Sequence, residues 1–200
     1  MGTGPFKITL REPNTKTVFK RNKKWWGTMK DDKVTEIHLL PIKNAATRVA
    51  ALLSGEIDVV TDAPVQDLAR IKNSPAHKVE STAQMRTIFL GMDQGADKLR
   101  TGNTGDNPFK KKAVRQALYQ AIDIEAIKKK VMRGLSEPAG IITFPGVNGY
   151  TEELDKRLPY DVAAAKKLLA DAGYPNGFEV ELRCPNDRYV NDEAICTAVV

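Results

Sequence analysis

The chain has 200 residues, of which 42% are hydrophobic, and this length and composition suit a globular protein with a core and argue against disorder. No apolar run approaches the roughly 20 residues that a membrane-spanning helix needs, so a spanning protein is excluded. The net charge of +6 is concentrated at the start, because residues 1–48 hold eleven Lys and Arg against four Asp and Glu, whereas residues 49–200 hold twenty against twenty-one.

The first forty residues are predicted to be rich in β-structure. Residues 6–10 and residues 17–20 alternate apolar and polar side chains on either side of the turn-forming pair Pro13 and Asn14, which predicts an antiparallel hairpin. Residues 34–40 alternate in the same way and predict a third strand.

A strand, helix, strand pattern is predicted next. Asn44 is a candidate N-cap and Gly55 a candidate left-handed C-cap, so we expect a helix between them. The residues that follow predict a short buried strand over 56–60, a helix over 64–71 and a further strand over 78–81. This alternation is typical of a βαβ unit.

The second half of the chain is predicted to repeat this alternation. We expect strands over residues 86–92 and 178–183, helices over 111–122, 124–132 and 162–172, and a last helix that starts near Asn191. A long irregular segment over residues 137–160 is rich in Gly and Pro. Because the chain begins in a predicted sheet and ends inside a predicted helix, we expect it to be an internal part of a longer protein.

A basic cluster, which we define as Lys20 to Trp26, is the sharpest local feature of the sequence. Four cations beside two stackable rings are the chemistry of single-stranded nucleic-acid binding. The alternative is a solvated turn whose tryptophans cover the edge of a core. We favour the turn, because nucleic-acid grooves usually need several such patches.

The cysteines, histidines and glycines predict no metal and no cofactor. The two histidines of the chain are far in sequence from Cys184 and Cys196, so no zinc spacing exists, and no complete phosphate-binding glycine motif is present. Two cysteines are too few for a disulfide scaffold. We favour two buried thiols over a redox or nucleophilic pair, and secretion would allow a disulfide instead.

A polar turn of four residues, Asn186, Asp187, Arg188 and Tyr189, precedes the last predicted helix. It lies between a predicted strand and a predicted helix, where α/β folds place ligand-binding groups. Arg188 offers a bidentate fork for a carboxylate, and Tyr189 offers an aromatic wall. The alternative, which the spacing leaves open, is that the following Asn or Asp caps the helix and the turn is structural.

Short motifs follow one another in order across nearly the whole chain. They are Gly2-Thr3-Gly4-Pro5-Phe6, Phe19-Lys20-Arg21-Asn22 with Trp26-Gly27, residues 48–58, Asn107-Pro108-Phe109, residues 114–118 and 121–123, Tyr160-Asp161, residues 165–169 and residues 172–178. In this order they resemble the solute-binding proteins of family 5 in bacterial ABC importers, a family that includes oligopeptide-, dipeptide- and nickel-binding proteins. Each motif alone is weak, but the ordered series is specific.

The resemblance implies a fold and a function. The fold is α/β, the two-lobe, type II architecture of periplasmic binding proteins, incomplete in this chain, with residues 1–84 in lobe one and residues 85–200 in lobe two. The function is that of a non-enzymatic component of an ABC importer, which captures a peptide or similar small solute between the lobes and delivers it to permease subunits in the membrane. No nucleic-acid partner is implied, and the basic cluster becomes a structural turn.

The resemblance also implies a location and a site. The protein is expected in the periplasm or lipid-anchored outside the cell, with its signal sequence absent from this part of the chain. The crossing strand between the lobes would end at Met92, Asp93 and Gln94, where the family commonly has an apolar residue followed by Asn. The charge of Asp93 could pair with a cationic ligand, or it could form a surface ion pair. We therefore predict that Met92, Asp93 and Gln94 bind the solute together with Asn186, Asp187, Arg188 and Tyr189.

Overall fold

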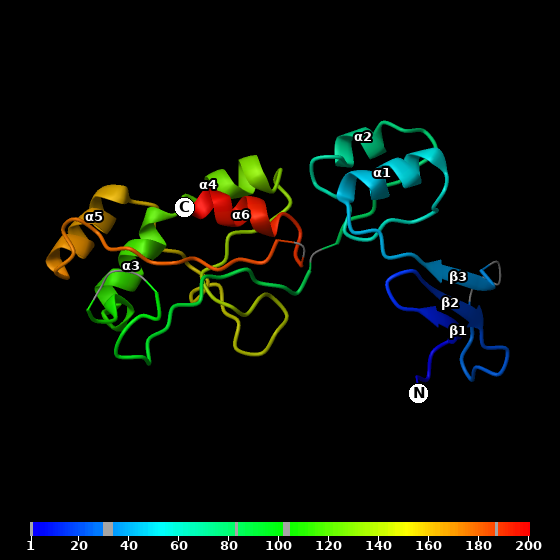
Figure 1. Cartoon of the computed structure of the whole chain (residues 1–200), viewed down its shortest axis with the longest axis horizontal. Coiled ribbons are helices and arrows are strands. Elements are labelled where there is room, and N and C mark those ends of the chain that lie inside the picture. The colour runs from blue at the N-terminus through cyan, green and yellow to red at the C-terminus, as the bar shows by residue number, and fades with distance from the viewer. Residues whose placement is uncertain (1, 30–33, 83, 102–104, 187) are drawn as a thin grey trace. The chain divides into compact units, whose positions relative to one another are not determined.

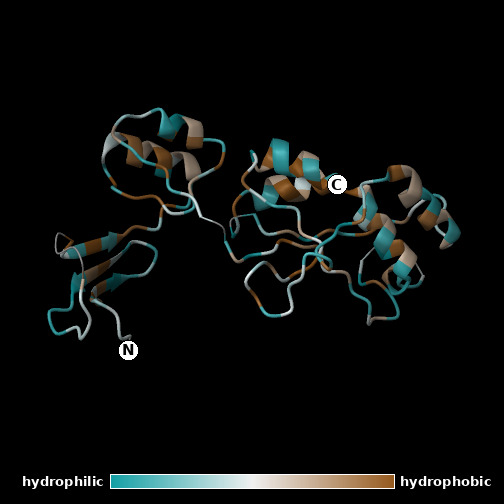
Figure 2. Ribbon diagram, turned by 180° about the vertical axis from the view of Figure 1, so that it is seen from behind, coloured by the Kyte–Doolittle hydropathy of each residue, from teal (hydrophilic) through white to brown (hydrophobic). Residues whose placement is uncertain are grey.

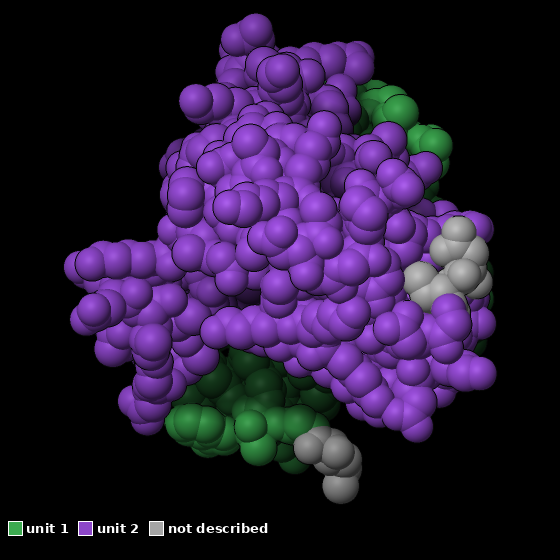
Figure 3. Space-filling model, turned by 90° about the vertical axis from the view of Figure 1, so that its left-hand side faces the viewer, with its two compact units in different colours: residues 1–61 green, residues 62–200 purple. Residues whose placement is uncertain are grey.

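The computed structural model describes residues 2–29, 34–82, 84–101, 105–186 and 188–200. The chain divides into two compact units, Met1–Thr61 and Asp62–Val200, which are coloured separately in Figure 3. This division differs from the predicted boundary after residue 84. The predicted boundary concerns the two lobes of a complete binding protein, and it stays a prediction.

The first unit contains an antiparallel sheet in the order β1-β2-β3, formed by β1 (Phe6–Glu12), β2 (Lys16–Arg21) and β3 (Glu36–Leu39) (Figure 1). The predicted hairpin and third strand are therefore confirmed. The hairpin turns at Asn14, whose positive φ of 60° suits a short polar residue. Val18, in the central strand, is buried and anchors the sheet.

A single helix, α1 (Ala45–Ser54), follows the sheet in the first unit. The Asn44 side chain accepts a hydrogen bond from the Thr47 backbone N–H at 2.9 Å, which satisfies one of the free donors at the helix start. Gly55 ends the helix with a φ of 79°, a left-handed conformation that glycine adopts at low cost. Both predicted caps are confirmed.

The regular elements described in the second unit are short helices joined by long irregular segments. These elements are α2 (Leu68–Lys72), η1 (Pro108–Lys110), α3 (Lys112–Ala121), α4 (Ile124–Ala126), η2 (Ile127–Val131), α5 (Val162–Asp171) and α6 (Asp192–Val199). The helix predicted over 124–132 is thus α4 continued by one π-helical turn, η2. The helix predicted over 64–71 begins only at Leu68, because Pro64 belongs to a separate turn that the Asp67 N–H closes.

The main packing contact of the second unit joins α3 to α5. Val114 and Ala117 on α3 are completely buried, and Ala165 on α5 is nearly so. The hydropathy colouring in Figure 2 shows apolar and polar residues alternating along these helices, as amphipathic helices require. The Asp161 carboxylate accepts from the Ala164 N–H at 2.9 Å and caps α5 as predicted.

Four predicted strands are wrong. Residues 56–60, 78–81, 86–92 and 178–183 form no strand, and so the predicted βαβ unit is not formed either. The physical reason is that a strand is stable only beside a hydrogen-bonded neighbour, and none of these segments has one within the described residues. Their apolar side chains are correspondingly open to solvent, with Val59 76% and Phe89 62% exposed.

Candidate functional site

The second unit contains an open groove of about 540 Å³. Residues 86–91 form one wall and residues 180–185 form another, and α6 and Phe109 contribute further side chains. The lining is mixed, because aliphatic residues such as Ile88 and Val199 lie beside charged ones. An apolar groove with a few polar groups is typical of a small-molecule site.

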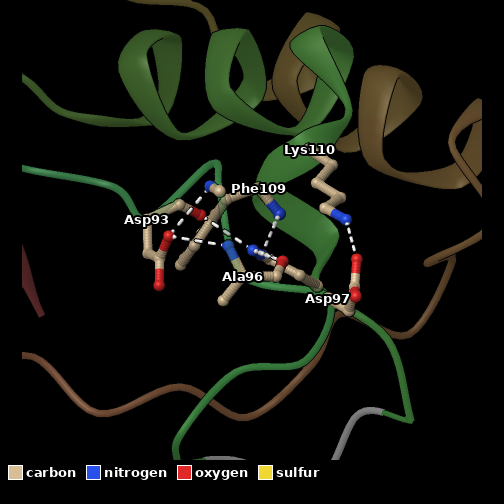
Figure 4. A network of polar contacts seen from close by, with 7 residues as sticks. Asp93, Ala96, Asp97, Phe109 and Lys110 are labelled. Carbon is tan, nitrogen blue, oxygen red and sulfur yellow. Dashed lines mark hydrogen bonds and ion pairs between the residues drawn. The ribbon is translucent and has the colours of Figure 1, made fainter.

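Asp93 follows the groove wall over residues 86–91 and is held by its own loop (Figure 4). Its carboxylate accepts hydrogen bonds from the backbone N–H groups of Gly95, at 2.9 Å, and Ala96, at 3.1 Å. The N–H groups of Ala96 and Gly95, together with the charges of Arg100 and Lys110, hold the pKa of Asp93 below its ordinary value. The loop therefore stabilises the charged form of Asp93.

Asn107 holds this loop through its side-chain amide. Its buried side-chain amide donates to the backbone carbonyls of Asp93 and Ala96, both at 2.9 Å, and its oxygen accepts from the Phe109 N–H at 3.0 Å. An ion pair between Lys110 and Asp97 closes the same loop. Sequence reasoning placed Asn107 in a motif but did not predict that it positions Asp93.

The two predicted residues that flank Asp93 have a different environment. Met92 is half-buried and Gln94 is exposed, and neither lines the groove, whereas Asp93 does. No comparison or contact tests their role, so Met92 and Gln94 stay predictions.

The predicted polar turn is organised by Asp192, the first residue of α6. The Asp192 carboxylate is buried and accepts from the backbone N–H groups of Arg188 and Tyr189, each at 2.9 Å, and from that of Glu193 at 2.9 Å. Burial raises the pKa of Asp192, but these backbone hydrogen bonds outweigh it and lower the pKa. Asn191, the other candidate cap, makes no side-chain cap bond.

The four residues of this turn do not share one environment. Tyr189 is half-buried and lines the groove with Asp93, so the structure brings together one residue from each predicted cluster. Arg188 is exposed, and Asn186 lines a neighbouring hollow. Asp187 lies outside the described residues.

Two guanidinium groups lie over the Tyr189 ring. Arg86 is 5.1 Å and Arg188 is 5.3 Å from the ring centroid, within the range of a cation–π interaction. Arg86 was not among the predicted site residues. It is separated from Tyr189 by about a hundred positions, and no sequence signal connects the two.

A disulfide joins Cys184, on the groove wall, to Cys196 on α6. The expectation of two buried thiols is therefore wrong, and the disulfide that secretion would allow is present. The burial on which that expectation rested is also absent, because Cys184 is exposed and Cys196 is only half-buried. The bond fixes α6 against residues 180–185.

The basic cluster is partly tied into the first unit. The Trp25 indole N–H donates to the Thr3 carbonyl at 2.8 Å, and Lys20 forms an ion pair with Glu36 at 3.3 Å. Trp26 is 83% exposed. The indole bond differs from the expectation that both tryptophans turn their N–H groups to water, and the exposure of Trp26 differs from the expectation that both cover the edge of a core.

Within the described ranges, no group of three or more His, Cys, Asp or Glu side chains is placed to hold a metal ion. Within the same ranges, no helix is both long and apolar enough to cross a bilayer.

The comparisons with known proteins agree with one another. The family model for bacterial extracellular solute-binding proteins, family 5 (middle), matches residues 1–200. The chain is 32% identical to the heme-binding protein A of Haemophilus influenzae over 182 residues, which are 90% of this chain and 31% of that protein. It is 31% identical to the di/tripeptide-binding protein 1 of Pseudomonas aeruginosa, over 91% of this chain and 32% of that protein.

Solved structures show the same relationship. The PBP AgaA from A. tumefacien, in complex with agropinic acid, is 31% identical with a TM-score of 0.70, over 98% of this chain and 38% of that one. The periplasmic binding protein DppA from Helicobacter pylori, in complex with a peptide, is 27% identical with a TM-score of 0.65, over 88% of this chain and 32% of that one. The chain thus spans about a third of the length of the proteins it matches.

Proposed function

Because the chain belongs to the bacterial extracellular solute-binding proteins of family 5, we propose that the protein containing it is the substrate-binding component of an ABC importer. The observation that carries the proposal is the family match over all 200 residues. The protein would capture a solute between two lobes and deliver it to permease subunits in the membrane. The α/β, type II fold of the structural neighbours supports this architecture.

The solute is proposed to be a peptide or a similar small molecule. Relatives are named for heme, for di- and tripeptides and for glutathione, and a further neighbour was solved with Ni(L-His)2. These names differ although each protein is 27% or more identical to this chain over the aligned residues. These proteins therefore share a fold, and individual groove residues would determine which solute each one binds.

Binding by lobe closure gives the proposed physical mechanism. A solute that contacts both lobes binds the closed state more tightly than the open one, and it shifts the population toward closure by that difference in affinity. Residues 1–84 would belong to one lobe and residues 85–200 to the other. The proposed solute-facing residues of this chain are Met92, Asp93 and Gln94 together with the turn over residues 186–189.

The proposed location is the periplasm, or a lipid-anchored position outside the cell. The disulfide between Cys184 and Cys196 supports it, because such bonds persist in oxidising compartments and are rare in the cytosol. A solved neighbour described as a periplasmic binding protein agrees with it.

Binding without catalysis is proposed as the chemical role. Family 5 is made of binding proteins. The disulfide supports the proposal further, because both cysteines are bonded and neither offers the thiolate that a nucleophilic mechanism would need. The nucleic-acid alternative has no support from any relative.

Native mass spectrometry of the full-length protein, followed by thermal unfolding with di- and tripeptides, glutathione and heme, tests the proposal. We expect a bound small molecule, or stabilisation by one member of the panel. A solute present at 100 times its Kd would stabilise the protein by about 2.7 kcal/mol. A protein that carries no small molecule and is stabilised by no compound would contradict the proposal.

A further inference from the structure

We infer that the disulfide between Cys184 and Cys196 is a redox-sensitive latch of the groove. A small-molecule thiol opens the latch by attack at Cys184, and opening loosens the polar turn over residues 186–189 together with α6. The inference goes beyond the proposed function, because it assigns a site of chemical modification and does not depend on which solute the groove binds.

The disulfide closes a short ring around the polar turn. Its two cysteines are twelve positions apart, so the ring contains the turn and the N-terminal part of α6. Asp192, whose carboxylate accepts from the backbone N–H groups of Arg188 and Tyr189, also lies inside the ring. A change that frees the two ends of the ring therefore acts on the turn.

The disulfide ties the groove wall over residues 180–185 to α6. Within the described ranges, no backbone hydrogen bond joins residues 180–185 to another segment. On its other side α6 packs against η2, and the Asn191 side chain donates to the Val131 carbonyl at 2.8 Å and accepts from Gln66 at 3.0 Å. The helix is thus held to η2 by packing and hydrogen bonds, whereas the covalent bond holds it to the wall.

Cys184 is the cysteine that a thiol reaches first. Cys184 is exposed, whereas Cys196 lies within α6 and is half-buried. Both cysteines line the groove of about 540 Å³ and also the neighbouring hollow of about 370 Å³, so a reagent has access to the bond from two sides. These volumes lie within the range of small-molecule pockets. Exposed disulfides are the labile ones, and we therefore expect this bond to react in the folded protein.

The exchange has two balanced steps. A thiolate attacks the Sγ atom of Cys184, the bond between the two protein sulfurs breaks, and its electron pair leaves on Cys196, whose thiolate takes a proton from water. A second thiolate then attacks the sulfur of the small molecule in this mixed disulfide and releases the thiolate of Cys184. In total the protein disulfide is reduced to two thiols, and two molecules of the small thiol are oxidised to one disulfide.

The turn is the part of the fold that responds to this reduction. A closed ring restricts the open conformations of the chain inside it, and reduction removes that restriction. The hydrogen bonds that hold the turn are those from the backbone N–H groups of Arg188, Tyr189 and Glu193 to Asp192. Because amide hydrogen exchange measures how often such bonds open, these three amides report the state of the latch.

Reaction of the folded full-length protein with 2-mercaptoethanol at neutral pH tests the site of attack. The reaction is stopped with acid, free thiols are labelled with N-ethylmaleimide, and trypsin, which cleaves after Arg183 and Arg188, places the two cysteines on different peptides for mass spectrometry. We expect the mixed disulfide on Cys184 about tenfold more often than on Cys196. Equal amounts, or a bond that reacts only after unfolding in urea, would overturn the inference.

Hydrogen exchange of the oxidised and the reduced full-length protein tests the conformational effect. Reduction should speed the exchange of the amides of Arg188, Tyr189 and Glu193 by about tenfold or more. The amides of α3 and α5, which pack against each other in the same unit, are the internal control and should not change. Unchanged exchange in the turn would show that the bond is reactive but is no latch.

Two variants complete the test. The double variant Cys184→Ser/Cys196→Ser has no bond in any buffer, so its turn should exchange as fast as that of the reduced protein and should not respond to thiol. Thr197→Ser is the matched control on α6, because serine keeps the hydroxyl that donates to the Glu193 carbonyl at 2.9 Å and leaves the disulfide in place. If Thr197→Ser speeds exchange in the turn as much as the double variant, the effect comes from disturbing the helix and the inference is overturned.

Discussion

The substitution Asn107→Ala tests whether one buried amide holds the loop that carries Asp93. Asn107 is only 2% exposed and makes three hydrogen bonds, two to carbonyls at 2.9 Å and one from the Phe109 N–H at 3.0 Å. Alanine leaves all three backbone groups without this partner. At about 1 kcal/mol for each lost bond, we expect the loop and η1 to lose about 3 kcal/mol of local stability.

Native-state hydrogen exchange followed by mass spectrometry measures this loss directly, because it reports the free energy of opening for each segment. Residues 93–110 should exchange faster in the variant, whereas β1 and β2 in the other unit should not change. Asn44→Ala is a suitable control, because its cap bonds to Thr47 lie in the first unit and their loss costs about 1 kcal/mol there. A change below about 1 kcal/mol over residues 93–110 in Asn107→Ala would refute the reasoning.

Three further predictions concern the second unit. The pKa of Asp192 is lower in the folded protein than its ordinary value of 3.8, so the carboxylate should stabilise the fold fully above pH 3.8 and lose this effect as the pH falls through the folded pKa. In urea unfolding measured at several pH values, Asp192→Asn should therefore show a smaller loss of stability at acid pH than the original protein, and an equal loss would contradict the prediction. Replacing Cys184 and Cys196 by Ser should lower the free energy of unfolding by about 3 kcal/mol, because the disulfide restricts the unfolded chain by closing a loop. Reductant should cause the same loss in the original protein, and a thermal unfolding curve that reductant leaves unchanged would contradict the prediction. Gly140→Ala should destabilise the segment over residues 137–160 by about 1–3 kcal/mol, because the new Cβ would lie 2.5 Å from the Asp155 carbonyl oxygen, and unchanged hydrogen exchange there would contradict the clash.

The helices could be predicted from the sequence because their signals are local. Asn44 and Gly55 bound α1, and Asp161 caps α5 through a bond to a residue three positions away. Such contacts depend only on neighbouring residues, so the sequence pattern contains everything needed to form them. The hairpin of β1 and β2 was predictable for the same reason, since its two strands are joined by a short turn.

The prediction of four further strands failed for the opposite reason. Residues 86–92 and residues 178–183 have the apolar pattern of strands, but a pattern does not supply the neighbour that completes the hydrogen bonds. The exposed Phe89 and Val180 show apolar surface that a paired and covered strand would bury. Strand prediction therefore depends on distant segments in a way that helix prediction does not.

The prediction of the candidate site from the sequence meets the same limit. The sequence identified Tyr189 and Asp93, which the fold brings to one groove, because each stands beside a recognisable turn or motif. It could not identify Arg86, because the fold brings Arg86 to the Tyr189 ring from about a hundred positions earlier in the chain. Asp192 is the clearest case: its sequence position suggests a helix cap, and its carboxylate also accepts from the backbone N–H groups of Arg188 and Tyr189 in the preceding turn. Contacts between distant segments, more than residues conspicuous in the sequence, decide which side chains line this groove.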